Sequence, residues 1–144
     1  MVRLPCVHGD GDRFTVPRYV DIARRTGRSA YVGDGTNRWP AVHHVAAARV
    51  FRLALEHGVP GVRYHAVAEE GVPFRQIAEV IGRRLGVPVV SVSPFAARRQ
   101  FRLYAPLESG DAPASSLLTR EWLGWRPEGP SLLADSDRPE YYDR

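Results

Sequence analysis

Apolar residues along the chain follow two spacings, one typical of amphipathic helices and one typical of buried strands. Apolar positions three and four residues apart, each series closed by a glycine, predict helices at 17–26, 45–57 and 74–85. Short runs rich in β-branched residues predict strands at 2–7, 29–32, 63–68 and 87–93. This alternation of strand and helix is typical of the α/β class.

Turn residues and helix caps set the expected limits of these elements. Pro5 has no N–H to donate, so we expect the first strand to stop or bulge there. Turns are expected at 8–12, 33–35 and 71–73. Shorter helices are expected at 94–101, 117–123 and 130–138, with a loop at 104–114. The core-facing side of the helix at 45–57 is expected to carry Ala47, Phe51, Ala54 and Leu55.

Composition limits the class of protein. The 144 residues suit about one domain, and a hydrophobic share of 44% with a charged share of 25% is ordinary for a globular protein. Arg3 and Pro5 interrupt the opening apolar run, and no stretch reaches the ~18 consecutive apolar residues of a membrane span. The one cysteine, Cys6, excludes an internal disulfide and reads as a small buried hydrophobe. We therefore expect a cytoplasmic protein without a membrane partner.

The net charge of +4 raises the question of nucleic-acid binding. The basic residues are scattered and do not alternate with aromatic residues along one stripe, and the sequence shows no helix-turn-helix, zinc-finger or RNA-binding signature. Paired arginines on helix faces are usually solvated. We therefore expect no nucleic-acid partner.

Two features of nucleotide-dependent enzymes are absent from the sequence. All 20 basic residues are arginine, so a Schiff-base lysine, a P-loop lysine and a Tyr-x-x-x-Lys pair are impossible in this chain. The dinucleotide-binding pattern G-x-G-x-x-G fails after Gly9 and Gly11, where Phe14 follows, and after Gly33, where Arg38 follows. We therefore assign no catalytic residue and expect no NAD or NADP binding by this chain alone.

The polar and aromatic stretch Asn37-Arg38-Trp39 carries the clearest candidate chemistry. An amide, a guanidinium and an indole together suit an anionic or sugar-like ligand, and we expect them in a loop before the helix at 45–57. The alternative is that Trp39 packs and Arg38 is a solvated surface charge. Both interpretations remain open from the residues alone.

Histidines occur beside other potential ligands in two places, and we expect no metal at either. His8 precedes Asp10 and Asp12 in alternation with glycine, a pattern typical of a turn. His43 and His44 are adjacent, so their side chains should point apart, whereas a metal needs spaced ligands from one face.

Three stretches together resemble the C-terminal half of an extended short-chain dehydrogenase/reductase, of the NAD-dependent epimerase/dehydratase family. The segment 2–9, V-R-L-P-C-V-H-G, resembles the family's late core strand. The segment 33–43, G-D-G-T-N-R-W-P-A-V-H, resembles the stretch that leads into the substrate domain, and 123–127, L-G-W-R-P, resembles a motif near the C-terminus. Their order and intervals agree with the family, and the similarity covers nearly all 144 residues.

This resemblance implies roles for nine residues. The nicotinamide of NAD or NADP would lie against Leu4, Pro5, Cys6 and Val7. The substrate side would comprise His8, Gly9, Asn37, Arg38 and Trp39, with the arginine on a substrate phosphate. The family's glycine-rich loop and its Ser/Thr and Tyr-x-x-x-Lys set precede the matched part. At Ala46 relatives commonly have an aspartate that caps the next helix, and losing such a cap costs ~1 kcal/mol.

The resemblance also implies a fold and leaves two functions open. We expect a single partial domain, the C-terminal portion of a Rossmann-like fold, whose parts are core strands at 1–12 and 60–70 and helices with a substrate-binding lobe at 13–58 and 71–144. One function is a truncated NAD(P)-dependent oxidoreductase or epimerase that binds a small molecule, sugar-like or a nucleotide sugar. The other is a stand-alone, non-enzymatic ligand-binding or interaction module. In the truncated form the strand at 2–7 lacks a neighbour, so its edge should pair with another chain or a second copy.

Overall fold

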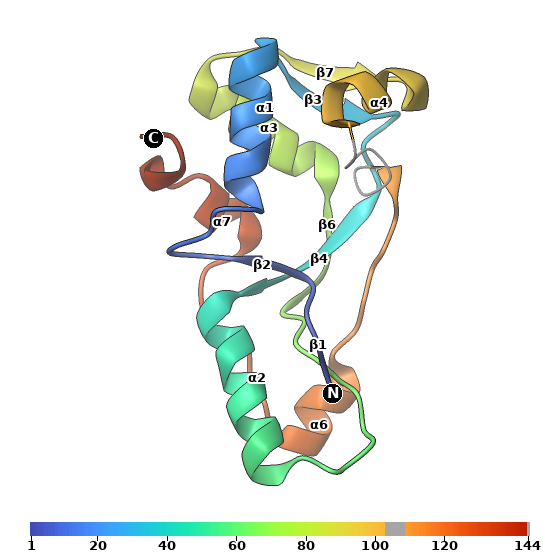
Figure 1. Cartoon of the computed structure of the whole chain (residues 1–144), viewed down its shortest axis with the longest axis vertical. Helices are drawn as coiled ribbons and strands as arrows, with labels where there is room; N and C mark the ends of the chain where they lie inside the picture. The colour runs from blue at the N-terminus through green and yellow to red at the C-terminus, as the bar shows by residue number, and fades with distance from the viewer. Residues whose placement is uncertain (103–108, 144) are drawn as a thin grey trace.

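A computed structural model describes residues 1–102 and 109–143 as an elongated molecule with one hydrophobic cluster toward each end (Figure 1). The strands are β1 Val2–Arg3, β2 Cys6–His8, β3 Ser29–Val32, β4 Arg38–His43, β5 Tyr64–His65, β6 Glu69–Pro73 and β7 Val89–Val92. The helices are α1 Val16–Thr26, α2 His44–His57, α3 Phe74–Leu85, α4 Pro94–Phe101, α6 Leu117–Leu123 and α7 Leu132–Ser136, followed by the 3-10 turn η2 Pro139–Tyr141. The α/β class is confirmed.

The strands pair in three small sheets. β1 is parallel to β5, β3 is parallel to β7, and β4 lies between a parallel β2 and an antiparallel β6. The expected break at Pro5 is confirmed, because Val2 pairs with Tyr64 while Cys6 pairs with Ala41 in another sheet. In the described residues β1 and β2 each have a neighbour on one side only.

The stretch from Arg38 to His43 is a strand, and the loop expected there was wrong. β4 holds this conformation because β6 pairs with its first half, from Arg38, and β2 pairs with its second half, to His43; Ala41, which pairs with both, is fully buried. Pro40, which cannot donate a backbone hydrogen bond, lies where the β4–β6 register shifts. The expected turn at 71–73 is likewise part of β6, since pairing with β4 outweighs the local turn preference.

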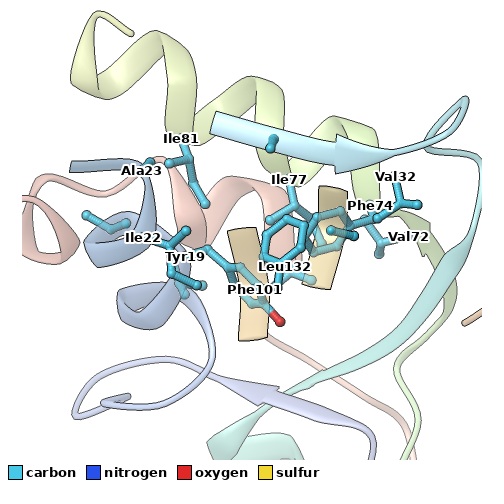
Figure 2. Packing of buried hydrophobic residues seen from close by; sticks show 14 of the residues in the cluster. Tyr19, Ile22, Ala23, Val32, Val72, Phe74, Ile77, Ile81, Phe101 and Leu132 are labelled. Carbon is cyan, nitrogen blue, oxygen red and sulfur yellow. The ribbon is translucent and has the colours of Figure 1, made fainter. Parts of the chain in front are cut away.

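The upper cluster in Figure 1 packs α1, α3 and α4 around the β3–β7 pair. The expected face of α3 is confirmed, with Phe74, Ile77 and Ile81 buried. Figure 2 shows Tyr19 of α1 and Phe101 of α4 beside these side chains. Edge-to-face ring contacts join Tyr19 to Phe74 and to Phe101, which fixes α1 against α3 and α4.

The lower cluster packs α2 and α6 against the β1–β5 pair and the end of β4. The face expected for α2 was only partly right. Ala46, Ala47 and Val50 are buried, whereas Phe51 is exposed and Leu55 is 88% exposed. Apolar residues occupy two adjacent stripes of this helix, and the neighbouring elements cover one of them. The indole of Trp125, buried against α2, donates to the carbonyl of Ala46 at 3.1 Å.

Three further boundaries differ from expectation, and one lies outside the described residues. β5 and β7 are shorter than the expected strands, and the helix expected at 130–138 is α7 followed by η2. The expected loop falls partly at 103–108, outside the described residues, while Ala112 donates to the carbonyl of Arg38 at 3.0 Å. Among the described residues, no helix combines the length and the apolar character needed to cross a membrane.

Candidate functional site

A cavity of about 470 Å³ lies where the Leu4–Cys6 segment, α1 and β4 meet. Its walls are Leu4, Pro5, Cys6, Thr15, Arg18, Tyr19, Trp39, Pro40, Gly110 and Ala112. The parallel pairing of β2 with β4 brings Leu4, Pro5 and Cys6, which were predicted to contact the cofactor, to the same cavity as Trp39. Val7, His8 and Gly9 line a neighbouring hollow of about 490 Å³ formed by the loop between β2 and α1.

The polar groups in the wall of this cavity already have partners within the protein. The hydroxyl of Thr15 donates to the carbonyl of Val7 at 2.8 Å. The guanidinium of Arg18 donates to the carbonyl of Phe14 at 2.9 and 2.7 Å and lies over the Tyr19 ring. Burial raises the pKa of the Cys6 thiol to about 12, and Asp12 adds to the effect, so the thiol is neutral at physiological pH. The surface offered to a ligand is therefore mostly apolar.

Asn37 and Arg38 face a different hollow from Trp39. That hollow, of about 430 Å³, is lined by both residues together with Asp34 and Asp111. The guanidinium of Arg38 forms a two-pronged ion pair with Asp111, at 3.0 and 2.8 Å, and its backbone N–H donates to the same carboxylate at 2.8 Å. Hydrogen bonds from Arg38 lower the pKa of Asp111 to about 2. The amide of Asn37 donates to the carbonyl of Gly110 at 3.4 Å.

Trp39 both packs and lines the cavity. Its ring lies 5.5 Å from the Tyr19 ring and 4.9 Å from the Phe74 ring, centroid to centroid. Arg38 and Trp39 line different hollows because successive side chains of a strand point to opposite faces. Asp111, the partner of Arg38, was missed because it is 73 residues away and no local signal links the two.

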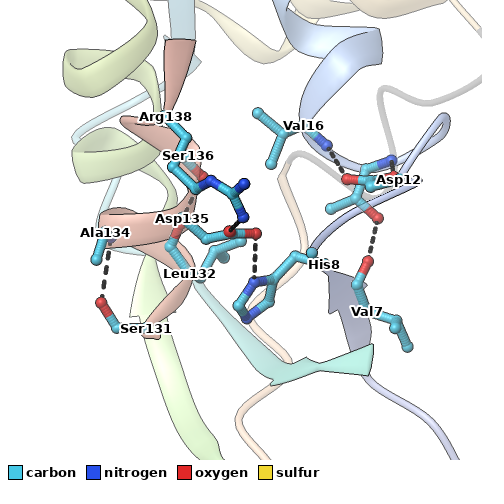
Figure 3. A network of polar contacts seen from close by, with 12 residues as sticks. Val7, His8, Asp12, Val16, Ser131, Leu132, Ala134, Asp135, Ser136 and Arg138 are labelled. Atoms are coloured by element: carbon cyan, nitrogen blue, oxygen red, sulfur yellow. Dashed lines mark hydrogen bonds and ion pairs between the residues drawn. The ribbon is translucent and has the colours of Figure 1, made fainter. Parts of the chain in front are cut away.

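His8 lies in a buried network that ties the end of β2 to the C-terminal segment (Figure 3). Its Nδ1 is 2.9 Å from Oδ2 of Asp135, and the side chains of both residues are 0% exposed. The hydroxyl of Tyr141 lies 2.9 Å from the same carboxylate oxygen and accepts from the N–H of Gly9 at 3.1 Å. Arg138 contacts the other oxygen of Asp135 at 3.3 Å.

Burial and hydrogen bonding have opposite effects on the pKa of Asp135 in this network. Burial alone would raise the pKa of Asp135, but hydrogen bonds from His8 and Tyr141 outweigh it, so that the pKa lies below its usual value. Burial raises the pKa of Tyr141. Sequence reasoning missed Asp135 and Tyr141, which are separated from their β2-end partners by 127 and 132 residues.

A group of histidine rings adjoins His8. His43 lies edge-on to His8 with centroids 5.6 Å apart, and His44 lies 4.4 Å from His43. Burial, followed by the neighbouring His44 and His8, lowers the pKa of His43. Within residues 1–102 and 109–143, no group of three or more histidine, cysteine, aspartate and glutamate side chains is arranged to hold a metal ion.

The strand, glycine turn and helix from β2 to α1 do not fit the pyrophosphate of a dinucleotide. A phosphate at such a place would need the free N–H groups of the helix N-terminus. Here the carboxylate of Asp12 accepts from the N–H groups of Phe14, Thr15 and Val16 at 2.8, 2.8 and 3.0 Å. A negatively charged side chain therefore already occupies the position that a phosphate would take.

Comparison with known proteins finds relatives of about twice the length. No family model matches the chain. The uncharacterized protein C2A9.02 of Schizosaccharomyces pombe is 47% identical over 138 residues, which are 96% of this chain and 47% of that protein. The uncharacterized protein YLL056C of Saccharomyces cerevisiae is 48% identical over 136 residues, 94% of this chain and 46% of that protein. The chain thus spans about half the length of the curated relatives it matches.

Solved structures establish the fold. The dTDP-glucose 4,6-dehydratase DesIV of Streptomyces venezuelae, solved with NAD and TYD bound, matches 98% of this chain and 42% of its own at a TM-score of 0.71 and 20% identity. Epimerase Mth375 of Methanothermobacter thermautotrophicus matches 98% of this chain and 42% of its own, with a TM-score of 0.70 and 16% sequence identity. MoeE5, in complex with UDP-glucuronic acid and NAD, matches 98% of this chain and 46% of its own, with a TM-score of 0.68 and 16% sequence identity. The chain has the fold of part of these Rossmann-like enzymes.

Proposed function

We propose that this chain is the substrate-binding part of an NAD(P)-dependent oxidoreductase or epimerase, the C-terminal half of an extended short-chain dehydrogenase/reductase. The observation that carries the proposal is the cavity between the Leu4–Cys6 segment and Trp39. Its position beside β2, a strand with one open edge among the described residues, suits a site that a second half completes.

Lengths and neighbours support this proposal. The yeast relatives are about twice as long, and the structural neighbours that bind NAD are matched over less than half of their chains. In a completed protein, Leu4, Pro5, Cys6 and Val7 would lie against the nicotinamide. The substrate would meet Trp39 directly, with Asn37 and Arg38 in the adjoining hollow, while His8 and Gly9 are buried at the end of β2 and would hold that wall in place.

The groups that this chain lacks indicate which steps of the reaction the other half of the protein would perform. NAD(P), when bound, supplies hydride transfer. Neither a lysine nor a fitting pyrophosphate site is present in the described residues, so the cofactor loop and the acid–base pair would come from the other half. The contribution of this chain is to bind and orient the substrate with largely apolar walls that exclude water.

Two measurements test the proposal. Calorimetric titration of NADH or NADPH into the 144-residue chain should give no heat of binding, and micromolar affinity would contradict a division into halves. A chimera that joins the unmatched part of the S. pombe protein to this chain should bind NAD(P)H, detected by enhanced cofactor fluorescence. A folded chimera without cofactor binding would count against the proposal.

One observation favours the alternative of a stand-alone binding module. The walls of the 470 Å³ cavity all come from this chain, so a ligand could bind without another half. The two functions differ in what cofactor does to ligand binding in the chimera. An enzyme half predicts that NAD(P)H changes ligand affinity, whereas a module predicts that affinity is the same with and without cofactor.

A further inference from the structure

Resting on the proposed function, we infer that the cavity takes a neutral, largely apolar ligand bearing a carbonyl or hydroxyl group, and not a nucleoside-diphosphate sugar. The inference comes from two observations on opposite faces of β4. On one face the arginine that could hold a phosphate is neutralised by a carboxylate. On the other face the cavity wall is mostly apolar, and the side chains of Thr15 and Arg18 in it are hydrogen-bonded to backbone carbonyls.

Arg38 is poorly placed to hold a diphosphate. Its guanidinium does not line the cavity, and both prongs go to Asp111 at 3.0 and 2.8 Å. A backbone hydrogen bond from Arg38 to the same carboxylate keeps Asp111 in position. A diphosphate would have to displace the two guanidinium hydrogen bonds and then remain beside the Asp111 carboxylate, whose pKa is about 2 and which the backbone N–H still holds. The pair as a whole carries no net charge for an anion to use.

The cavity itself suits an uncharged ligand. Leu4, Pro5, Trp39 and Pro40 present apolar surface, and the Cys6 thiol is neutral. The charged side chain in the wall, Arg18, is already hydrogen-bonded to a backbone carbonyl and stacked on an aromatic ring. Among the residues that the structure describes, no aspartate or glutamate lines this cavity. An aromatic or aliphatic body can replace water against such walls, while charged phosphates would lose hydration without compensation.

Trp39 provides a direct reporter of occupancy. The chain has three tryptophans, so a ¹⁵N–¹H spectrum has three indole signals, and Trp39→Phe identifies the signal of the cavity. Benzylacetone and benzyl alcohol serve as neutral probes, and UDP-glucose and UDP as charged ones. We expect the neutral probes to shift the Trp39 indole signal saturably at millimolar concentration, and the nucleotides to leave it unmoved.

The outcomes separate this inference from the proposed function. If UDP-glucose shifts the Trp39 signal and the neutral probes do not, the ligand class is wrong while the substrate cavity stands. If no probe moves the signal in a chain whose spectrum stays dispersed and folded, both the ligand class and the cavity are overturned.

A charge variant tests the reason for the preference. Asp111→Asn keeps the shape of the side chain but leaves Arg38 uncompensated, so UDP affinity should rise roughly tenfold or more, the effect of one charge-assisted hydrogen bond. Glu128→Gln, which removes the carboxylate from an exposed pair with Arg49 at 2.5 Å, is the matched control and should leave UDP binding unchanged. Equal UDP affinity in wild type and Asp111→Asn would overturn the role given to the Arg38–Asp111 pair.

Discussion

Replacing Asp135 by alanine should be among the most destabilising single changes in this protein. The Asp135 carboxylate and the His8 ring are both fully buried and 2.9 Å apart, and the Tyr141 hydroxyl shares the same carboxylate oxygen. Alanine leaves the His8 Nδ1 without its partner, in a place water does not reach. Tyr141 keeps its contact with Gly9, so the main loss falls on the pair with His8.

The expected magnitude follows from the burial of both side chains. Removing one partner of a fully buried pair costs about 3–5 kcal/mol in free energy of unfolding. For a chain of this length each kcal/mol lowers the melting temperature by roughly 3 °C, so Asp135→Ala should melt about 9–15 °C lower. Asp135→Asn keeps an acceptor of the same shape and should lose less, about 1–2 kcal/mol.

Urea unfolding followed by tryptophan fluorescence measures these differences, since Trp39 packs against the upper cluster that contains Leu132 and Tyr141, and buried Trp125 reports on the lower cluster. Asp137→Ala is the matched control: this carboxylate is two residues away and half exposed, paired with Arg83 and Arg84 at 2.9 Å. It should change stability little, because exposed ion pairs are screened by water. Equal midpoints for Asp135→Ala and Asp137→Ala would refute the assignment of a stabilising buried pair.

The same network predicts a dependence on pH. The pKa of Asp135 lies below the ordinary value of about 3.9, so the ionised carboxylate stabilises the fold above that pH. This contribution is lost as pH falls through the lowered folded-state pKa. The stability difference between wild type and Asp135→Asn should therefore shrink as the pH falls below about 4. A difference that grows on acidification contradicts this sign.

Three further predictions concern the segment around β2. Gly9 has φ +126°, and a Cβ added there would overlap the His44 ring and lie 2.7 Å from Nε2 of His43. Gly11 has φ +82° and open space around it, so Gly11→Ala should lower the free energy of unfolding by about 1–2 kcal/mol. Gly9→Ala should lower it far more, measured by urea unfolding. With a pKa of about 12, folded Cys6 at pH 8 should react with iodoacetamide on the order of 10³-fold more slowly than in the urea-unfolded chain, and equal rates would contradict the raised pKa. The open edge beside Leu4, which is 50% exposed, should make the chain associate with rising concentration in sedimentation, and Leu4→Lys should weaken this; a wild type that is monomeric throughout contradicts the prediction.

The local signals that predicted the fold correctly are those that act over a few residues. Gly27 and Gly86 follow α1 and α3 in the left-handed conformation, at φ +68° and +65°, as helix-ending glycines do. The 3.6-residue spacing placed the core face of α3, and Pro5 placed the break between β1 and β2. Each of these depends on backbone conformation or a repeat that the sequence displays directly.

Local signals failed where two parts of the chain compete for the same residues. The turn preference at 71–73 was outweighed by pairing with β4, and the loop character of Arg38 and Trp39 by pairing with β6. In α2 the spacing allowed two apolar stripes, and only the neighbouring β1, β4 and α6 decide which is buried. The energy that settles these cases comes from partners that are remote in the sequence.

The sequence by itself determined the α/β class, the absence of lysine and of a dinucleotide loop, and the identity of Leu4–Cys6 and Trp39 as candidates for one site. Tertiary structure decided how those candidates meet. It placed Trp39 in the cavity, turned Arg38 toward Asp111 and buried His8 against Asp135. The two side-chain pairs join residues 73 and 127 positions apart, and such pairs depend on how distant strands and helices pack, which local patterning does not encode.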